Sequence, residues 1–272
     1  MRNTLLTLSA LILVLVAFAN SAQAGTVSGE VRYTDKVPTT SGFGDTRYLP
    51  VPYARIELYR KTGPEVTDAI MISSDNLGAD GTFSFTVSNS LLGGNSDFQL
   101  RVYPDCDGGS TQPVRVLELD GVSVPVIFQG AAMVTDAAGD WTGVAGDIDT
   151  PSTLTVSEDN SGPFNIMFCI SRAAERVALM EGGTFPDRVT VYWEPGSTTG
   201  TYTESTSQSI YLLGNPTSDT DEFDDDVIVH EYGHFISYNY TQEDSPGGYH
   251  YGEEETCALR GQRPGPATSR PG

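Results

Sequence analysis

The chain is poor in positive charge. Lysine occurs only at Lys36 and Lys61, and 36 acidic residues against 15 lysines and arginines leave a formal net charge of −21. A surface of this charge repels the phosphates of nucleic acids and the head groups of anionic lipids. We therefore expect neither nucleic acid nor an anionic membrane as a partner.

Cysteine is also scarce. Cys106, Cys169 and Cys257 are odd in number and widely spaced, so they match neither a disulfide framework nor a zinc-ligand cluster. Cys169 lies among apolar residues that recur at helical spacing. We expect it to be a small buried residue rather than a reactive thiol.

Long apolar runs are missing beyond the N-terminus. The run from Leu5 to Ala19 is shorter than the about 20 residues that a membrane-spanning helix needs. Arg2 precedes it and Ala22-Gln23-Ala24 follows it, which is typical of a secretory signal peptide with its cleavage site. We expect residues 1–24 to be this signal peptide. The mature chain would then be secreted or periplasmic, with no stable membrane anchor after cleavage.

Residues 25–157 are β in character. Apolar and polar residues alternate in Ala54–Tyr59, Thr82–Val87 and Phe98–Tyr103, and Gly78–Gly81 is typical of a turn. Strands with one polar face are what a β-sandwich needs. The layout resembles immunoglobulin-like or transthyretin-like modules of secreted bacterial proteins. Three later segments could supply its last strands or a connection: Val114–Leu119, Val122–Phe128 and Ile148–Val156.

The periodicity changes after residues 157–163, which are polar and contain glycine and proline. Apolar residues from Met167 to Ala178 then follow helical spacing, and this helix is expected to end at Gly182-Gly183. Val189–Trp193 and Ser209–Leu213 are predicted strands. The residues between them, 194–208, are rich in Gly, Ser and Thr and are expected to form a surface loop or a hairpin.

The strongest motif is the sequence His230-Glu231-Tyr232-Gly233-His234, which holds two of only three histidines. On a helix, a spacing of four residues places both imidazoles on one face, where they can bind one tetrahedral zinc ion. Glu231 would be placed to take a proton from a water molecule that the metal activates. We predict one zinc ion per chain, with His230 and His234 as ligands and Glu231 as the catalytic residue. The alternative is a structural helix that carries two surface or core histidines.

An acidic segment, Asp219–Asp226, leads into this helix. One of Asp224, Asp225 and Asp226 is expected to be the N-cap, and the other carboxylates suit the positive end of the helix dipole. A Ca²⁺ site in Asp219–Asp226 is the alternative, although the carboxylates do not follow the spacing of an EF-hand loop.

The order helix, strand, strand, H-E-x-x-H helix resembles the upper half of a zincin peptidase domain, with a gluzincin-like site around Asp219–His250. The resemblance implies that the strand before the zinc helix is an edge strand, to which the substrate backbone adds. It places that strand at Ser209–Leu213. The implied substrate-binding residues are Ser209, Ile210, Tyr211 and Leu212.

Zinc catalysis needs a third protein ligand. In the resembled proteins this is a glutamate in a W-S-E-G-like helix after an S-P-G-G segment, and no such helix follows Ser245–Gly248 here. His250 or Glu253 could close the site. The alternative is that His250 is a loop histidine and that Glu253, with Glu254 and Glu255, belongs to a solvated run.

The last residues, 258–272, contain three arginines, three prolines and no acid. They could be a natural disordered tail, or the reading frame slips or the gene is truncated near Cys257. The change in composition and the missing ligand favour the second explanation. Translation of the encoding DNA in the other two frames tests it, because the absence of a W-S-E-G-like continuation would exclude a frameshift.

The predicted fold is an immunoglobulin-like β-sandwich over residues 25–157, followed over 163–257 by the incomplete upper half of a zincin-type α+β metallopeptidase domain. Residues 258–272 would be a disordered or aberrant tail. The predicted function is that of an exported zinc-dependent metallopeptidase acting on peptides or proteins, weakly active or inactive without its third ligand. The alternative is a non-enzymatic cell-surface or matrix-binding protein that uses the β-sandwich.

Overall fold

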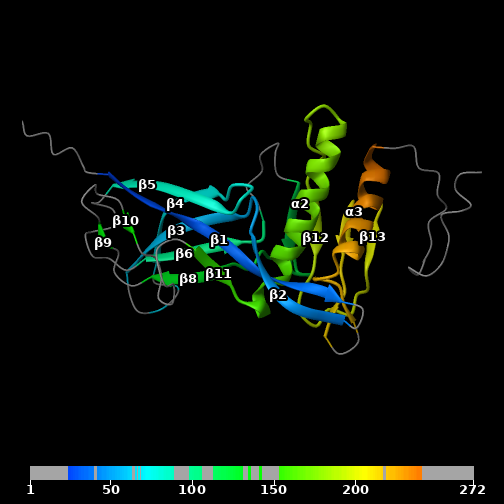
Figure 1. The fold of residues 1–272 in the computed structure, drawn as a ribbon, viewed down its shortest axis with the longest axis horizontal. Coiled ribbons are helices and arrows are strands. Elements are labelled where there is room, and N and C mark those ends of the chain that lie inside the picture. The colour runs from blue at the N-terminus through cyan, green and yellow to red at the C-terminus, as the bar shows by residue number, and fades with distance from the viewer. Residues whose placement is uncertain are drawn as a thin grey trace, which may run out of the picture. The chain divides into compact units, whose positions relative to one another are not determined.

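The computed structural model describes residues 24–39, 42–62, 65, 67, 69–88, 98–105, 113–130, 134–135, 141–142, 153–216 and 219–240. This described part is rich in β-strands and contains two α-helices, so the expectation of a β-dominated fold with some helix is confirmed (Figure 1). Within it, no helix is long and apolar enough to cross a membrane.

The chain divides into two compact units. The first comprises residues 1–34, 47–103 and 125–160, and the second comprises residues 35–46, 104–124 and 161–272. The segment around Val114 thus belongs to the second unit. The sequence-based domain boundaries, 25–157 and 163–257, stay predictions.

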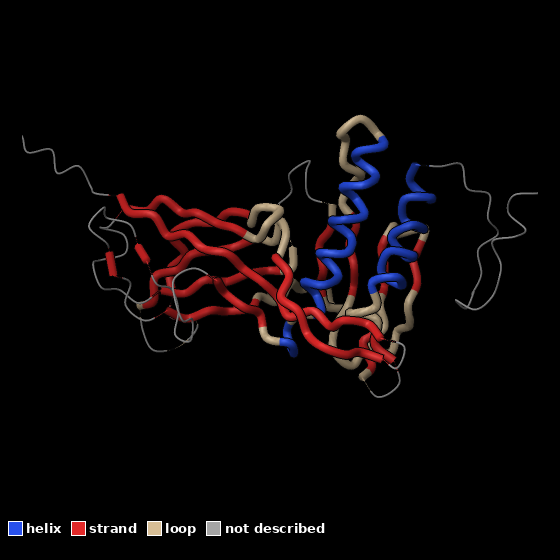
Figure 2. Tube along the Cα trace, in the orientation of Figure 1, coloured by secondary structure: helices blue, strands red, loops and turns tan. Residues whose placement is uncertain are grey.

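The first unit is built on two sheets (Figure 2). One has the strand order β4-β3-β6-β8, in which all neighbours are antiparallel. Its strands are β3 (Arg55–Lys61), β4 (Ala69–Asn76), β6 (Phe98–Tyr103) and β8 (Val126–Gly130). The other sheet is centred on β1 (Ala24–Thr39), which pairs antiparallel with β5 and parallel with β10 and β11. Its remaining strands are β2 (Gly42–Pro50), β5 (Thr82–Ser88), β9 (Val134–Thr135), β10 (Trp141–Thr142) and β11 (Thr153–Val156). Residues 35–39 of β1 and 42–46 of β2 belong to the second unit. A short 3₁₀ helix, η1 (Glu158–Asn160), follows β11.

The alternation in the sequence corresponds to an alternation in burial. In β5, Phe83, Phe85 and Val87 are buried, whereas the residues between them are exposed. Ile56 and Leu58 of β3 are fully buried as well. Because successive side chains of a strand point to opposite faces, this pattern gives β5 one buried apolar face. Strand β3 is buried on both faces, since Glu57 between Ile56 and Leu58 is only 7% exposed.

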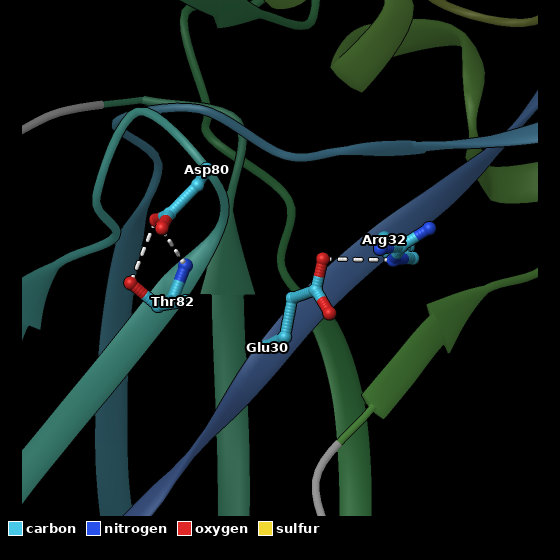
Figure 3. Close-up of polar contacts among 4 residues, drawn as sticks. All are labelled: Glu30, Arg32, Asp80 and Thr82. Atoms are coloured by element: carbon cyan, nitrogen blue, oxygen red, sulfur yellow. Dashed lines mark hydrogen bonds and ion pairs between the residues drawn. The ribbon is translucent and has the colours of Figure 1, made fainter.

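The turn before β5 is held by a short polar network. The Asp80 Oδ1 atom accepts hydrogen bonds from the Thr82 hydroxyl at 2.7 Å and from the Thr82 backbone N–H at 3.2 Å (Figure 3). These bonds stabilise the carboxylate and lower the pKa of Asp80. Gly81 has φ +78°, and a Cβ atom there would lie 2.5 Å from the Val31 carbonyl oxygen. The position therefore requires glycine, as expected for this turn.

Next to this turn, an ion pair lies along β1. Arg32 Nε is 2.7 Å from Glu30 Oε1 (Figure 3). The two residues are two positions apart on one strand, so both side chains lie on the same face of the sheet. This polar face lies opposite the buried Val31.

The second unit contains a four-stranded sheet with the order β13-β14-β12-β7. Its strands are β7 (Val114–Leu117), β12 (Val189–Tyr192), β13 (Tyr202–Glu204) and β14 (Ser209–Tyr211). Strands β7, β12 and β14 are parallel, and β13 is antiparallel to β14. Helices α2 (Gly162–Met180) and α3 (Asp225–Tyr240) contact each other, while α2 contacts β7 and α3 contacts β13 and β14 (Figure 1). The small pair β15 (Gly214–Asn215) and β16 (Asp219–Thr220) lies before α3.

One face of this sheet is apolar and meets the helices. Val191 of β12 is in register with Val116 of β7 and with Ile210 of β14, and Ile210 is in register with Thr203 of β13. Residues in register share a face. The three apolar side chains in this row are buried, and Thr203 contacts α3 through Glu231.

The expectation that Ser209–Leu213 forms an edge strand is wrong. Strand β14 lies between β12 and β13 and pairs with a neighbour on both sides, so Ser209, Ile210 and Tyr211 cannot receive an added strand. Leu212 donates its backbone N–H to the Tyr192 carbonyl oxygen at 3.1 Å. Among the described strands, β13 is the one that ends this side of the sheet, and it lies in the segment expected to be a loop or a hairpin.

The C-terminal end of α2 lies where the sequence predicted it, just before Gly182 and Gly183. Its last residue is Met180, and Gly182 and Gly183 follow with positive φ angles. The Gly183 backbone N–H donates to the Ala178 carbonyl oxygen at 2.7 Å. This is the bond of a Schellman-type C-terminus, which favours glycine. The predicted end of the helix is confirmed.

We expect the core of the first unit to depend on β3. Replacing Leu58, which is 0% exposed, with alanine removes buried apolar contacts and should lower the free energy of unfolding by about 2–5 kcal/mol. Ile70 on the neighbouring strand β4 is 54% exposed, so Ile70→Ala is the matched control and should cost less than about 1 kcal/mol. Urea denaturation measures both values. Equal losses in the two variants would contradict this assignment of the core.

Candidate metal centre

Helix α3 is fixed by one buried stripe. Ile228, Glu231, Tyr232 and Phe235 are its buried residues, at the spacing of three and four that marks one face of a helix. The adjoining face is more open: His230 is exposed and His234 is half-buried. The burial of the stripe therefore determines which way the two histidines point.

The helix begins with an aspartate cap. Asp224 Oδ1 accepts a hydrogen bond from the Val227 backbone N–H at 3.2 Å, and the Asp224 carbonyl oxygen accepts from the Ile228 N–H at 3.0 Å. This is the bonding of an N-cap residue. Of the three candidates in the sequence, the structure selects Asp224.

Asp225 instead links α3 to α2. Its Oδ1 atom accepts from Asn165 Nδ2 at 3.0 Å and from the Cys169 thiol at 3.1 Å. Cys169 is buried, as predicted. The two neighbouring aspartates thus have different tasks, since one caps the helix and the other positions it against α2.

The two histidines converge. His230 Nε2 and His234 Nε2 lie 3.2 Å apart, and the ring planes are inclined by 89°. Two nitrogen ligands, each about 2.05 Å from one tetrahedral zinc ion, would lie roughly 3.3 Å apart. The observed separation therefore fits two ligands of a single ion. Tyr238 lies beside His234, with ring centroids 6.2 Å apart and planes inclined by 22°.

Glu231 is only 7% exposed and faces the sheet. The Thr203 hydroxyl oxygen lies 2.7 Å from Glu231 Oε2 and 2.8 Å from the Glu231 carbonyl oxygen. A buried carboxylate needs such a donor, because its charge is costly without a hydrogen bond. Thr203 is in β13, so this contact ties the carboxylate to the end strand of the sheet.

Sequence reasoning did not identify Thr203. The residue stands in a segment rich in serine and threonine, where one more hydroxyl carries no periodic signal. Its role follows only from the pairing of β13 with β14, which brings it next to a helix 28 positions further along the chain.

The acidic segment before α3 is partly buried. Asp221 is buried and accepts a hydrogen bond from the Thr201 hydroxyl. Burial raises the pKa of Glu222. Among the described residues, no group of three His, Cys, Asp or Glu side chains is arranged to hold a metal ion. The Asp219 side chain lies outside the described residues, and Ca²⁺ at Asp219–Asp226 stays a prediction.

The candidates for a third zinc ligand, His250 and Glu253, also lie outside the described residues. His230, His234 and Glu231 all lie on helix α3, and the two imidazole rings converge. The structure adds Thr203 as the hydrogen-bond partner of the carboxylate.

No known family model matches the chain, and no curated protein does. Among solved structures, a 9R-lipoxygenase from Cyanothece PCC8801 is similar at 16% identity, over 58% of this chain and 23% of that chain, with a TM-score of 0.28. An (S)-allantoin synthase is similar at 15% identity, over 47% of this chain and 41% of that chain, with a TM-score of 0.22. The chain spans less than half of either structure, and similarities this weak carry no argument about fold or function.

The N-cap assignment can be tested by substitution. Asp224→Ala removes the side-chain acceptor and should lower the free energy of unfolding by about 1 kcal/mol. Asp224→Asn keeps an oxygen acceptor at the same place, so this control should retain most of the stability. Thermal or urea unfolding followed by circular dichroism measures both. The assignment fails if Asn and Ala at this position are equally destabilising.

Proposed function

We propose that this protein is an exported zinc-dependent metallopeptidase. The observation that carries the proposal is the convergence of His230 Nε2 and His234 Nε2 at 3.2 Å, with Glu231 on the same helix. The separation suits one zinc ion, and imidazole is a common zinc ligand. The proposal includes a secretory signal peptide over residues 1–24.

In this proposal the first unit is an immunoglobulin-like β-sandwich and the second is part of a zincin-type domain. Two sheets that bury the apolar side chains of their strands support the first assignment. A sheet with both α-helices in contact, an antiparallel end strand and the H-E-x-x-H motif on α3 support the second. The zinc site would be completed by a third protein ligand, for which His250 and Glu253 are the candidates.

The residues have distinct tasks. His230 and His234, in their neutral forms, would hold zinc through their Nε2 atoms. When bound, zinc supplies a Lewis acid that polarises a peptide carbonyl and lowers the pKa of water. Glu231 would accept a proton from the attacking water at its carboxylate and pass it to the leaving amine. Thr203 holds that carboxylate in position through its hydroxyl.

We expect one zinc ion per chain, bound through the two histidines. His230→Ala and His234→Ala each remove a zinc ligand. Loss of a residue that only hydrogen-bonds a ligand already weakens metal binding by about 10- to 100-fold, so each of these variants should weaken zinc binding at least as much. The parent chain is expected to hydrolyse peptides weakly or not at all. Glu231→Gln should keep zinc and abolish any hydrolysis that the parent shows, because the amide cannot accept the proton. Metal analysis at a buffered free zinc concentration and cleavage of a quenched fluorescent peptide library measure the two properties.

Two results would contradict the proposal. Zinc bound equally by the parent chain and by His230→Ala would place the metal elsewhere. Peptide hydrolysis that survives both a chelator and Glu231→Gln would exclude this helix as its origin. His250→Ala and Glu253→Gln, measured in the same series, identify the third ligand by their loss of zinc affinity.

Thr203 should act as a positioning residue. Thr203→Val keeps the shape of the side chain but removes the hydroxyl, so we expect kcat to fall by about 10-fold while KM and zinc content stay nearly unchanged. Thr203→Ser restores a donor and should restore most of kcat. If valine and serine give the same kcat, or if only KM changes, the hydroxyl does not position Glu231.

A further inference from the structure

One of the only two lysines of the chain lies beside the segment that leads into helix α3. Lys36 is in β1, within the part of that strand that belongs to the second unit. Its Nζ atom is 4.8 Å from the centroid of the Phe223 ring and 5.8 Å from the centroid of the Phe43 ring. An ammonium group within about 6 Å of a ring centroid is attracted to the face of the ring. Lys36 therefore makes two cation–π contacts.

The two aromatic rings also contact each other. The centroids of Phe43 and Phe223 lie 6.2 Å apart, and the ring planes are inclined by 73°. This edge-to-face arrangement is favourable for an aromatic pair. Phe43 is in the part of β2 that belongs to the second unit. Residues 35–39 of β1 and 42–46 of β2, here called the arm, thus bring one ammonium group and one ring against Phe223.

The residue that the arm contacts stands at the start of the helix. Phe223 directly precedes Asp224, the N-cap of α3, and is only 4% exposed. The residue before it is held by α2, because Asn165 Nδ2 donates a hydrogen bond to the Glu222 carbonyl oxygen at 3.0 Å. The entry into α3 is therefore contacted by α2 and by the arm.

The charge of Lys36 needs compensation at this place. The first turn of a helix carries a partial positive charge, so a cation near it is unfavourable by itself. Glu222 supplies the opposite charge. Burial raises the pKa of Glu222, whereas its own backbone N–H and the charge of Lys36 oppose this rise. The lysine charge therefore stabilises the ionised form of this carboxyl, which an uncharged side chain of the same length would not do.

The place where α3 begins determines where its catalytic carboxylate lies. From residue 224 to residue 231 the helix axis advances by about 10 Å, at a fixed rise of 1.5 Å per residue. A shift of the start along the axis is therefore passed on to Glu231. Its Oε2 atom is 2.7 Å from the Thr203 hydroxyl, and a hydrogen bond is lost once this distance exceeds about 3.5 Å. The two histidines differ in this respect, because both move with the same helix.

We propose that Lys36 is a positioning residue of the candidate metal centre. It fixes the start of α3 through Phe223 and Glu222, and the fixed start keeps Glu231 within reach of Thr203. The inference rests on the proposed function in giving Glu231 a task in proton transfer. The contact with Phe223 itself does not depend on zinc.

Hydrogen–deuterium exchange of the full-length chain measures how firmly the start of α3 is held. The Ile228 N–H, which donates to the Asp224 carbonyl oxygen, reports on the first turn. In Lys36→Met, which keeps an unbranched side chain without charge, this amide should exchange about tenfold faster. Lys36→Arg retains the cation and should restore the protection. Lys61→Met removes the other lysine, which is in β3, and as the matched control should leave Ile228 unchanged.

Titration of Glu222 separates a role of the charge from a role in packing. Carbon-13 NMR of the side-chain carboxyl should give a higher pKa of Glu222 in Lys36→Met than in the parent chain, because the ionised form loses a stabilising charge. Lys36→Arg should keep this pKa near that of the parent. Asp221, the other charge that acts on the carboxyl, is the same in all these chains. A role in packing alone would leave the pKa unchanged.

A double-mutant cycle tests the step from Lys36 to Glu231 without any measurement of activity. If the lysine keeps Glu231 within reach of Thr203, the loss of unfolding free energy caused by Thr203→Val should be smaller in Lys36→Met than in the parent chain. Strictly additive losses would overturn this step. Equal exchange of Ile228 in Lys36→Met and in the parent, or in Lys36→Met and Lys61→Met, would overturn the proposal as a whole.

Zinc binding by the same variants separates this result from the test of the proposed function. Faster exchange in Lys36→Met, in a chain that binds no zinc, would support Lys36 as a residue that positions α3 and would reject the peptidase. Zinc that is lost in His230→Ala, with exchange that Lys36→Met leaves unchanged, would support the metal site and reject the positioning role.

Discussion

The burial of one stripe of helix α3 is the constraint on which the candidate site depends. Ile228, Tyr232 and Phe235 are buried, and this fixes the rotation of the helix about its axis. With the rotation fixed, His230 and His234 must lie on the neighbouring face, and their Nε2 atoms converge. The two histidines therefore need no contact between distant parts of the chain to come together. Packing orients the helix, and the spacing of four residues brings the two rings onto one face.

The contact between Thr203 and Glu231 extends this local arrangement to the sheet. It joins the carboxylate proposed to move protons to β13, the end strand of the described sheet. Successive side chains of β13 point to opposite faces of the sheet. Thr203 therefore contacts Glu231 on the helix side, whereas Tyr202 stacks on Tyr211 on the other side.

The sequence predicted best where the signal is local. Alternation in Thr82–Val87 matches the burial of β5, glycine marks the end of α2, and the histidine spacing matches the convergence of the two rings. The order of strands in the second sheet was harder to predict, because residues of β7 pair with residues of β12 that lie 75 positions further along the chain. Strand β13 has only three residues, too few for a periodic pattern, and the resemblance to zincins placed the edge strand at Ser209–Leu213 instead.

The central claim is that His230 and His234 bind one metal ion through their Nε2 atoms. X-ray absorption at the zinc edge of the purified, zinc-loaded chain tests this claim most directly. The account predicts zinc with two imidazole ligands at about 2.0–2.1 Å, falling to one in His234→Ala. A zinc spectrum without imidazole scattering, or one that is unchanged in His234→Ala, would contradict it.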